Sequence, residues 1–262
     1  MESILQIRHL SVRFGSNRVL RNLTFDIARG ETVAIIGESG CGKTVLLKNL
    51  IGLIRPTSGA IRFEGRNIPD LAEDELARTR TRYGFVFQQA ALFDSMTILQ
   101  NLMFPKVQHT QETQEEILET VKKLVTEVGL PMNVLEKKPA ELSGGMRKRV
   151  GIARALVMNP ELMLYDEPTT GLDPIMTDVI NELMLRTARE HPVTSIIVTH
   201  DMSTVRKVAN RVIMLYPLTH LAPDEPQVLF DGPSNQIEQC TDPRVRDFIS
   251  GNGTSRIREL DR

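Results

Sequence analysis

The stretch that decides the fold is Gly37-Glu38-Ser39-Gly40-Cys41-Gly42-Lys43-Thr44. It has the form G-x-x-x-x-G-K-[ST], the pattern of a phosphate-binding loop. The residues before it, Thr32–Ile36, are an apolar and mostly β-branched run typical of a buried strand. The residues after it, Val45–Leu53, carry apolar side chains at helical spacing. Because the motif requires a strand before the glycines and a helix after them, we predict a nucleotide site here.

The chemistry of this loop assigns a role to each kind of residue in it. Glycines let backbone N–H groups converge on phosphate oxygens, and the start of the following helix adds a positive partial charge. Lys43 is expected to reach the β- and γ-phosphates, and Thr44 to ligate Mg²⁺. The alternative, an accidental glycine-rich turn, does not explain the flanking strand and helix. Cys41 lies near Lys43 and the helix start, which predicts a thiol of lowered pKa.

Composition restricts the classes of function. The 262 residues contain 32 Lys and Arg against 33 Asp and Glu, a formal net charge of −1. This balance predicts no nucleic-acid partner and no general attraction to anionic membranes. The two cysteines, Cys41 and Cys240, argue against a disulfide framework and favour a reducing compartment. No signal peptide is recognisable in Met1–Leu5, and no apolar run approaches the roughly 20 residues that span a bilayer. Any spanning part is therefore expected in separate subunits.

Two strands are predicted ahead of the loop, over residues 4–14 and 19–27, around the turn at Gly15. They form an antiparallel layer, which is unusual for simple kinases. Phe14, at the end of the first strand, offers an aromatic face on which an adenine ring could stack. From the residues alone, packing of Phe14 in the core is the favoured interpretation.

The rest of the chain alternates strands and helices. Strands are expected at 60–64, 83–87, 162–165, 194–199 and 211–215, and helices at 70–81, 111–128, 147–158, 174–189 and 205–209. Strand patterns cease between residues 90 and 150, so this stretch is predicted to be a helical subdomain. Alternating strands and helices imply a mostly parallel sheet with the antiparallel layer on one side.

Polar side chains stand at the ends of predicted strands, namely Gln88, Asp166, Glu167 and His200. A carboxylate at the C-terminal end of a strand can orient hydrated Mg²⁺, which makes Asp166 a metal candidate. Glu167 could polarise an attacking water, and His200 could donate to the γ-phosphate. Gln88 could reach both Mg²⁺ and the water. Taken singly, each has a structural alternative, since a histidine after a strand is usually a hydrogen-bonded core residue.

A second candidate anion site lies at Leu142-Ser143-Gly144-Gly145, where glycines precede a predicted helix. Ser143 is placed near the N-cap of that helix. The alternative is a flexible Gly-Gly joint. The order and spacing of all these motifs together argue against the separate structural alternatives.

In this order and spacing the motifs resemble those of the ATP-binding-cassette (ABC) ATPases, over essentially the whole chain. The resemblance implies that Gly37–Thr44 is the Walker A loop and that Gln88 is the Q-loop. It makes Leu142–Met146 the signature, in which Ser143, Gly144 and Gly145 contact nucleotide. The implied fold is an α/β P-loop core with a mostly parallel sheet, an antiparallel β-subdomain and an inserted α-helical subdomain.

The same resemblance assigns the catalytic groups. Asp166 would be the Walker B aspartate that binds Mg²⁺, with Glu167 as the catalytic base beside it. Asp173 would belong to the D-loop near the nucleotide, and His200 would be the switch histidine. Phe14 would be the aromatic residue that stacks on adenine, although the family more often has Tyr there.

Within the family, two segments look like the Mla/Mce-associated ATPases of bacterial phospholipid transport. These are residues 87–97 with the following 101–105, and the tail 242–249. Between Leu215 and Phe230 the chain departs from the pattern, because Tyr216–Gln227 carries three prolines where relatives have a tighter turn. The implied domains are a nucleotide-binding core over 1–89 and 151–239, a helical subdomain over 90–150 and a docking tail over 240–262.

The resemblance implies an ATPase that uses ATP and Mg²⁺ and drives phospholipid transport between the inner and outer bacterial membranes. It implies a head-to-tail homodimer, in which the signature of one copy touches ATP on the Lys43 of the other. The implied partners are an integral-membrane permease, an Mce-domain lipid-binding subunit and a small accessory cytoplasmic subunit. The implied location is the cytoplasm, peripheral on the inner face of the cytoplasmic membrane.

Two alternatives remain at this point. One is the ATPase subunit of another ABC importer or exporter. The other is a non-transport ABC protein of translation or DNA repair, although such proteins usually carry two cassettes or a long coiled-coil insertion. A plain P-loop kinase is excluded by the signature and His200.

Overall fold

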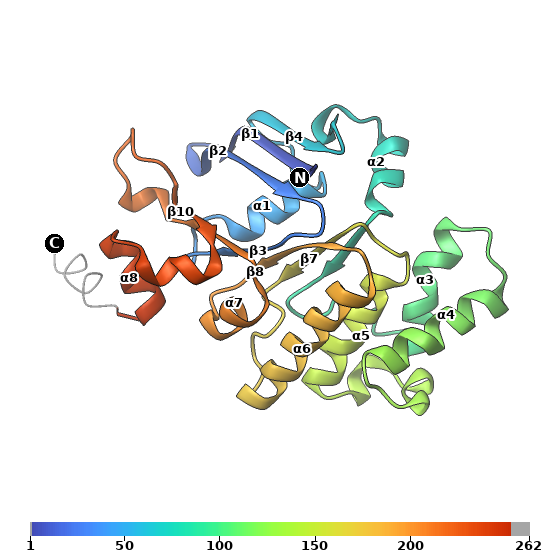
Figure 1. Cartoon of the computed structure of the whole chain (residues 1–262). Coiled ribbons are helices and arrows are strands. Elements are labelled where there is room, and N and C mark those ends of the chain that lie inside the picture. The colour runs from blue at the N-terminus through green and yellow to red at the C-terminus, as the bar shows by residue number, and fades with distance from the viewer. Residues whose placement is uncertain (1, 253–262) are drawn as a thin grey trace. The chain divides into compact units, whose positions relative to one another are not determined.

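The computed structural model describes residues 2–252, so the end of the predicted tail, 253–262, lies outside the described residues. The chain divides into two compact units. Unit 1 contains the described residues up to Leu71 and those from Val198 onward, and unit 2 contains Ala72–Ile197. Figure 1 labels the elements in both. The predicted domain boundaries at 89, 150 and 239 follow a different division and stay predictions.

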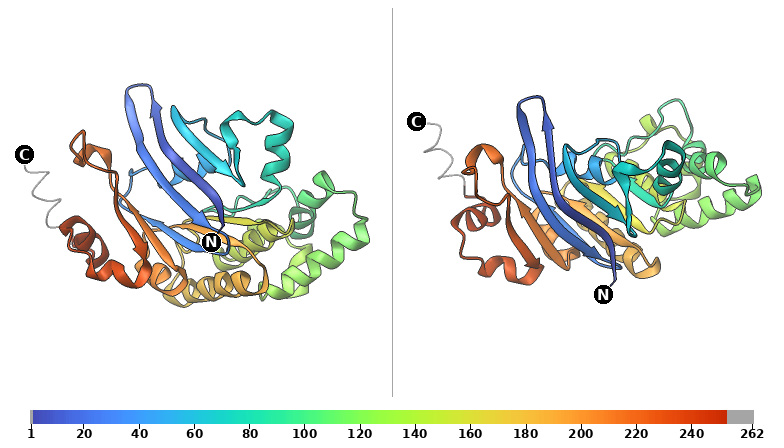
Figure 2. Two further views of the ribbon diagram at one scale, coloured as in Figure 1. Left: turned by 45° about the horizontal axis from the view of Figure 1, so that its top comes forward. Right: turned by 90° about the horizontal axis from the view of Figure 1, so that it is seen from above.

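Unit 1 contains an antiparallel sheet of order β2-β1-β4-β5. Its strands are β1 (Ser3–Phe14), β2 (Asn17–Ala28), β4 (Ser58–Phe63) and β5 (Arg66–Asn67). Figure 2 shows β1 and β2 as a long hairpin with β4 beside β1. Burial along β1 alternates at Leu5 and Ile7 and again at Leu10 and Val12, with a shift of register between Ile7 and Leu10, where His9 has φ +50°. The period of two within each part leaves one face of the sheet covered.

A second set of strands in unit 1 holds the phosphate-binding loop. Its order is β10-β9-β3, with β9 parallel to β3 and antiparallel to β10. The strands are β3 (Thr32–Ile36), β9 (Arg211–Leu215) and β10 (Val228–Pro233). The helices are α1 (Lys43–Leu50), α7 (Met202–Val208) and α8 (Pro243–Ser250), with short 3₁₀ turns η1 (Ile68–Asp70), η4 (Leu218–His220) and η5 (Ser234–Gln239).

Unit 2 contains the neighbouring strands β8, β7 and β6 and most of the helices. The strands are β6 (Tyr83–Val86), β7 (Leu162–Asp166) and β8 (Thr194–Val198), the last of which ends at the unit boundary. The helical elements are α2 (Glu73–Arg80), α3 (Ile98–His109), α4 (Gln114–Glu127), η2 (Met132–Glu136), η3 (Pro139–Glu141), α5 (Gly144–Leu156) and α6 (Pro174–Glu190). Strands β6 and β7 are parallel. No strand lies between Val86 and Leu162, so the prediction of helices there is confirmed.

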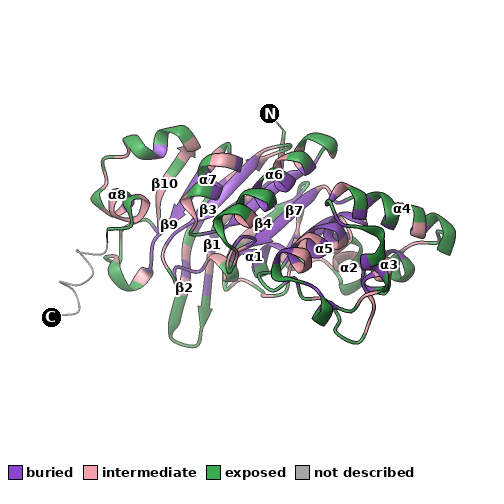
Figure 3. Ribbon diagram, turned by 90° about the horizontal axis from the view of Figure 1, so that it is seen from below, coloured by how far each residue is buried: buried purple, intermediate pink, exposed green. Residues whose placement is uncertain are grey.

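Burial follows the predicted strands closely. All five residues of β3, β7 and β8 are buried, as expected for central strands of an α/β sheet. Figure 3 shows β3, β7 and β9 in the colour of buried residues, while much of the helix surface is exposed.

Several helix limits differ from the predicted ones, and capping explains the differences. Helix α1 ends at Leu50, three residues early, because Gly52 adopts φ +67° and the Leu53 N–H donates back to Lys48 O at 2.9 Å. Helix α4 begins at Gln114 because Thr113 caps it, accepting from the Glu116 N–H at 3.3 Å. The predicted helix over 70–81 is instead η1 followed by α2.

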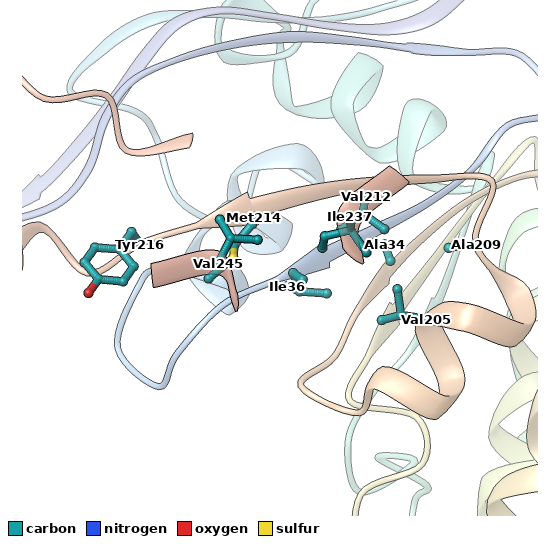
Figure 4. Close-up of a cluster of buried hydrophobic side chains, with 9 residues drawn as sticks. All are labelled: Ala34, Ile36, Val205, Ala209, Val212, Met214, Tyr216, Ile237 and Val245. Carbon is teal, nitrogen blue, oxygen red and sulfur yellow. The ribbon is translucent and has the colours of Figure 1, made fainter. Parts of the chain in front are cut away.

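The tail helix α8 packs on its own unit. Val245 is fully buried in a cluster with residues of β3, β9, α7 and η5, and Phe248 and Ile249 lie against the same cluster. Figure 4 shows Val245 close to Met214 and Ile36 in this cluster. The structure therefore places Val245 of the predicted docking tail in the chain's own core.

Candidate functional site

The phosphate-binding loop has the backbone geometry that an anion site needs. Gly37, Gly40 and Gly42 have φ of +145°, +82° and +98°, values that residues with a side chain rarely adopt. Gly42 is the N-cap of α1, and the first turn of α1 has no acidic residue. The loop therefore leads into the positive end of a helix whose first turn carries no acidic residue, which suits phosphate.

Lys43 lies across this loop. Its Nζ donates to Gly37 O at 2.6 Å and to Glu38 O at 3.0 Å. The ammonium group is thus held over the loop by backbone carbonyls, from where it can donate to a phosphate oxygen. Thr44 follows it in the first turn of α1 and is exposed, in a position open to a metal ligand role.

His200 and Phe14 also belong to unit 1, and both side chains are accessible. His200 is exposed directly after β8, so the alternative of a core histidine is wrong. Phe14 is 49% exposed, so the packing in the core favoured from the residues alone is also wrong. An exposed ring can stack on a base, as the family resemblance implies. Asp201 fixes the turn after His200 by capping α7, accepting from the Ser203 N–H at 2.8 Å.

Unit 2 carries the predicted Q-loop and Walker B residues. Asp166 is the last residue of β7 and is buried, and Glu167 follows it with φ +50°. The Oε2 of Glu167 accepts from Thr170 Oγ1 at 3.0 Å. Gln88 lies exposed after β6. A non-glycine residue in the left-handed region indicates a backbone held by its surroundings, as is common at functional sites.

One charged residue in this region was not predicted from the sequence. Lys148 of α5 is 6% exposed, and its Nζ donates to Gln88 O at 2.5 Å and to Glu167 O at 3.2 Å. Burial lowers the pKa of this ammonium group, although Glu167 and Asp166 oppose the effect. Lys148 thus ties the backbone of the Q-loop to that of the catalytic-base candidate. The only sequence signal was a lysine on the inward face of the signature helix.

One signature residue, Gly144, lines a pocket within unit 2. Ser143 caps α5, accepting from the Met146 N–H at 3.3 Å, and both Ser143 and Gly144 are exposed. Gly145 is buried, and a Cβ there would meet Met176 Cε at 2.5 Å. The pocket measures about 390 Å³, and its lining includes Gln88, Gly144, Lys148, Thr170 and Gly171.

Asp173 has a structural role in unit 2, while its place near the nucleotide stays a prediction. It is the N-cap of α6, and its Oδ1 accepts from the N–H groups of Ile175 and Met176, both at 2.9 Å. This arrangement fixes the end of the D-loop against the start of the helix.

The pKa of the Cys41 thiol is raised, so the prediction of a lowered pKa is wrong. Cys41 is 1% exposed, and burial raises the pKa of the thiol more than the nearby Lys43 lowers it. The sequence shows that Cys41 lies two residues from Lys43, but it does not show that other segments bury the Cys41 side chain. Cys41 is therefore not the activated thiol that the sequence suggests.

We expect N-ethylmaleimide to label Cys41 at least ~10-fold more slowly than free cysteine at pH 7, because thiolate is the reactive form and the side chain is covered. The rate should rise only as the pH passes above the ordinary thiol range. Mass spectrometry of a Cys240→Ala variant between pH 7 and 9.5 would measure it. Rapid labelling at pH 7 that MgATP prevents would contradict this expectation.

No described helix is both long enough and apolar enough to cross a membrane. This finding agrees with the absence of a long apolar run in the sequence.

Comparison with known proteins adds to this geometry. A sequence profile of the family described as ABC transporter matches residues 20–170. The probable ribonucleotide transport ATP-binding protein mkl of Mycobacterium leprae is 40% identical over 248 residues, 94% of this chain and 69% of that protein. The intermembrane phospholipid transport system ATP-binding protein MlaF of Haemophilus influenzae is 34% identical over 257 residues, 98% of this chain and 94% of that protein.

A solved structure shares the fold. It is a dimeric ATP-binding cassette in a post-hydrolysis state, bound to ADP and Pi, with 30% sequence identity and a TM-score of 0.78. The match covers 88% of this chain and 98% of that chain. Together with the phosphate-binding loop in unit 1 and the Walker B and signature segments in unit 2, these matches show that the chain belongs to the ABC transporter family, as an ATP-hydrolysing subunit with the ABC ATPase fold.

Proposed function

We propose that this subunit drives phospholipid transport between the inner and outer membranes of a bacterium. The observation that carries the proposal is the similarity to the H. influenzae phospholipid transport protein, which spans 94% of that protein and nearly all of this chain. It includes the region of α8, outside the residues that the general family profile matches.

Within the site we propose that the glycine loop and Lys43 hold the ATP phosphates, with the Phe14 ring on the adenine. Thr44, Gln88 and Asp166 would supply the oxygen ligands that Mg²⁺ prefers, and a bound ion there would neutralise charge on the phosphates. Glu167 takes the proton of the attacking water, and His200 donates to the γ-phosphate.

ABC cassettes work as dimers with membrane permease subunits, and we propose a homodimer here. The exposure of Ser143 and Gly144 supports it, because these groups are accessible to nucleotide on a second copy. The solved relative bound to ADP and Pi is itself a dimer. An Mce-domain subunit and a small accessory cytoplasmic subunit complete the proposed complex, which would hold this chain at the inner face of the cytoplasmic membrane.

The permease contact is proposed to lie on unit 2, around the loop after Gln88. Phe93 in this loop is 43% exposed, while Leu92 and Met96 are half-buried. The buried Asn101 holds the loop, since its Oδ1 accepts from the Phe93 N–H at 2.7 Å and its Nδ2 donates to Phe93 O at 3.1 Å. The Phe93 ring also packs edge-on against the Phe104 ring, with 5.1 Å between the ring centres.

A pocket in the same unit supports this assignment. It measures about 400 Å³, and its lining includes the aromatic residues Tyr83, Phe85 and Phe87 with Pro105. A rigidly held aromatic residue and an aromatic pocket provide apolar surface of the kind that marks an interface.

We expect Phe93→Asp and Leu92→Asp to leave the KM for ATP within about twofold and to reduce phospholipid transfer at least ~10-fold or dissociate the permease. Each would be purified with the permease and assayed for ATPase activity and lipid transfer between labelled vesicles. Met132→Asp is the matched control, because Met132 is a 44% exposed apolar residue elsewhere in unit 2. Unchanged assembly and transfer in both variants would disprove the contact.

The cargo requires a separate test, because the 40% identical M. leprae relative is named for ribonucleotide transport. The purified complex in vesicles should show ATP-dependent transfer of fluorescent phospholipid, and its ATPase activity should rise with added phospholipid. Stimulation by ribonucleotides without phospholipid transfer would instead favour the second cargo.

A further inference from the structure

The segment Tyr216–Gln227, which the family resemblance marks as an insertion, closes on itself beside the phosphate-binding loop. It leaves the end of β9 and returns to the start of β10, both within unit 1 (Figure 1). The Tyr216 N–H donates to Gln227 O at 2.9 Å, so its two ends lie side by side.

The β9 end of the segment contacts the first residue of the loop. A Cβ on Gly37 would meet Leu215 O at 2.1 Å, so the backbone of the loop lies directly against the strand end. Leu215 is the residue immediately before the insertion.

The other end reaches the middle of the loop through one buried side chain. Gln227 is 2% exposed, and its Nε2 donates to Cys41 O and to Val19 O, each at 3.0 Å. Its Oε1 accepts from the Arg21 N–H at 2.8 Å. The amide therefore uses both donor hydrogens and its oxygen, and it links the phosphate-binding loop to β2.

The segment is in turn supported on its outer side. Arg21 donates to the carbonyl oxygens of Ala222, at 2.9 Å, and Glu225. Arg244 of α8 donates to Glu225 Oε1 at 3.2 Å, and its guanidinium lies 5.3 Å from the centre of the Tyr216 ring. These contacts hold the insertion in one conformation, so that Gln227 is presented to the loop with little freedom.

We propose that Gln227 is a positioning residue for ATP binding, and that the insertion exists to present it to the Cys41 carbonyl of the phosphate-binding loop. The Cys41 carbonyl belongs to the same planar peptide group as the Gly42 N–H, so a donor that fixes this carbonyl also fixes the orientation of that N–H in the loop. Without that donor the loop has more conformations to lose when ATP binds, and affinity falls.

The test uses Gln227→Met, which keeps the length but removes all three hydrogen bonds, and Gln227→Glu, which keeps the acceptor for the Arg21 N–H but removes both donors. We expect the KM for ATP to rise about tenfold in both variants, with a smaller change in kcat. Asp224→Asn is the matched control, since Asp224 is exposed in the same segment. Its KM should equal that of the unchanged protein.

A second measurement reports on the loop itself. In a Cys240→Ala background, maleimide labelling of the buried Cys41 should become about tenfold faster with Gln227→Met but not with Asp224→Asn. Urea denaturation gives the free energy of unfolding of each variant. This value sets the fraction of unfolded molecules, and so the part of the Cys41 labelling rate that global unfolding can explain.

Unchanged KM and unchanged Cys41 labelling in both Gln227 variants would overturn the proposal. It would also be wrong if global unfolding accounted for all of the faster labelling and the folded fraction kept a normal KM, because Gln227 would then be structural only. A raised KM together with labelling faster than global unfolding allows would support it.

Discussion

A Glu167→Gln variant is expected to bind ATP as tightly as the unchanged protein and to hydrolyse it at least ~100-fold more slowly. In the unchanged protein Thr170 Oγ1 donates to Glu167 Oε2 at 3.0 Å, and glutamine keeps an oxygen that can accept this hydrogen bond. It also leaves unchanged the backbone carbonyl that accepts from Lys148. The substitution therefore removes the ability to take a proton from water and little else.

The trapped ATP provides a second measurement. Gel filtration of Glu167→Gln with MgATP should show a dimer that ADP does not support, because ATP would bridge the phosphate-binding loop of one copy and the signature of the other. Glu136→Gln, at an exposed carboxylate elsewhere in unit 2, serves as the control and should turn over normally. Normal turnover in Glu167→Gln would remove this residue from the mechanism.

Val245→Asp is expected to lower the free energy of unfolding by about 3 kcal/mol or more, because it places an unpaired charge in a dry site. Val245 is fully buried against Met214, Tyr216 and their neighbours in unit 1. Truncation after Gln239 should act in the same direction, since it also removes Phe248 and Ile249 from that cluster.

Urea denaturation would measure this effect. Arg246→Gln is the matched control, because Arg246 is exposed next to Val245 on the same helix and should change stability by less than about 0.5 kcal/mol. If Val245→Asp were as stable as the control, the packing of α8 on its own core would not contribute to folding, and a neighbouring subunit would be the better candidate for its partner.

Much of the fold could be predicted because its signals are local. The β-branched run Thr32–Ile36 became β3 with the predicted limits, and the glycines after it took the positive φ values that the loop requires. Ser143 caps α5 as expected, although the helix begins at Gly144 rather than Arg147. Helix ends were predicted less well, because backbone hydrogen bonds such as Leu53 N–H to Lys48 O determine them and apolar spacing does not.

The candidate site was predicted in part for the same reason. The apolar pattern identifies the strands near which Gln88, Asp166 and His200 lie. In the structure Asp166 is the last residue of β7, while Gln88 and His200 lie two residues beyond the ends of β6 and β8. The core packing favoured for Phe14 and the lowered pKa expected for the Cys41 thiol were wrong, because both depend on which distant segments cover a residue.

The sequence by itself determined the α/β cassette, the phosphate-binding loop and the order of its motifs, since glycine conformation, capping and strand periodicity act over a few residues. Only the tertiary structure decided that Lys148 joins Gln88 to Glu167 and that Gln227 holds Cys41. Lys148 and Gln88 are 60 residues apart in the sequence, and Gln227 and Cys41 are 186 residues apart. Contacts over such separations depend on which strands become neighbours and on which side chains are buried between them. Neither can be predicted from a short stretch of the sequence.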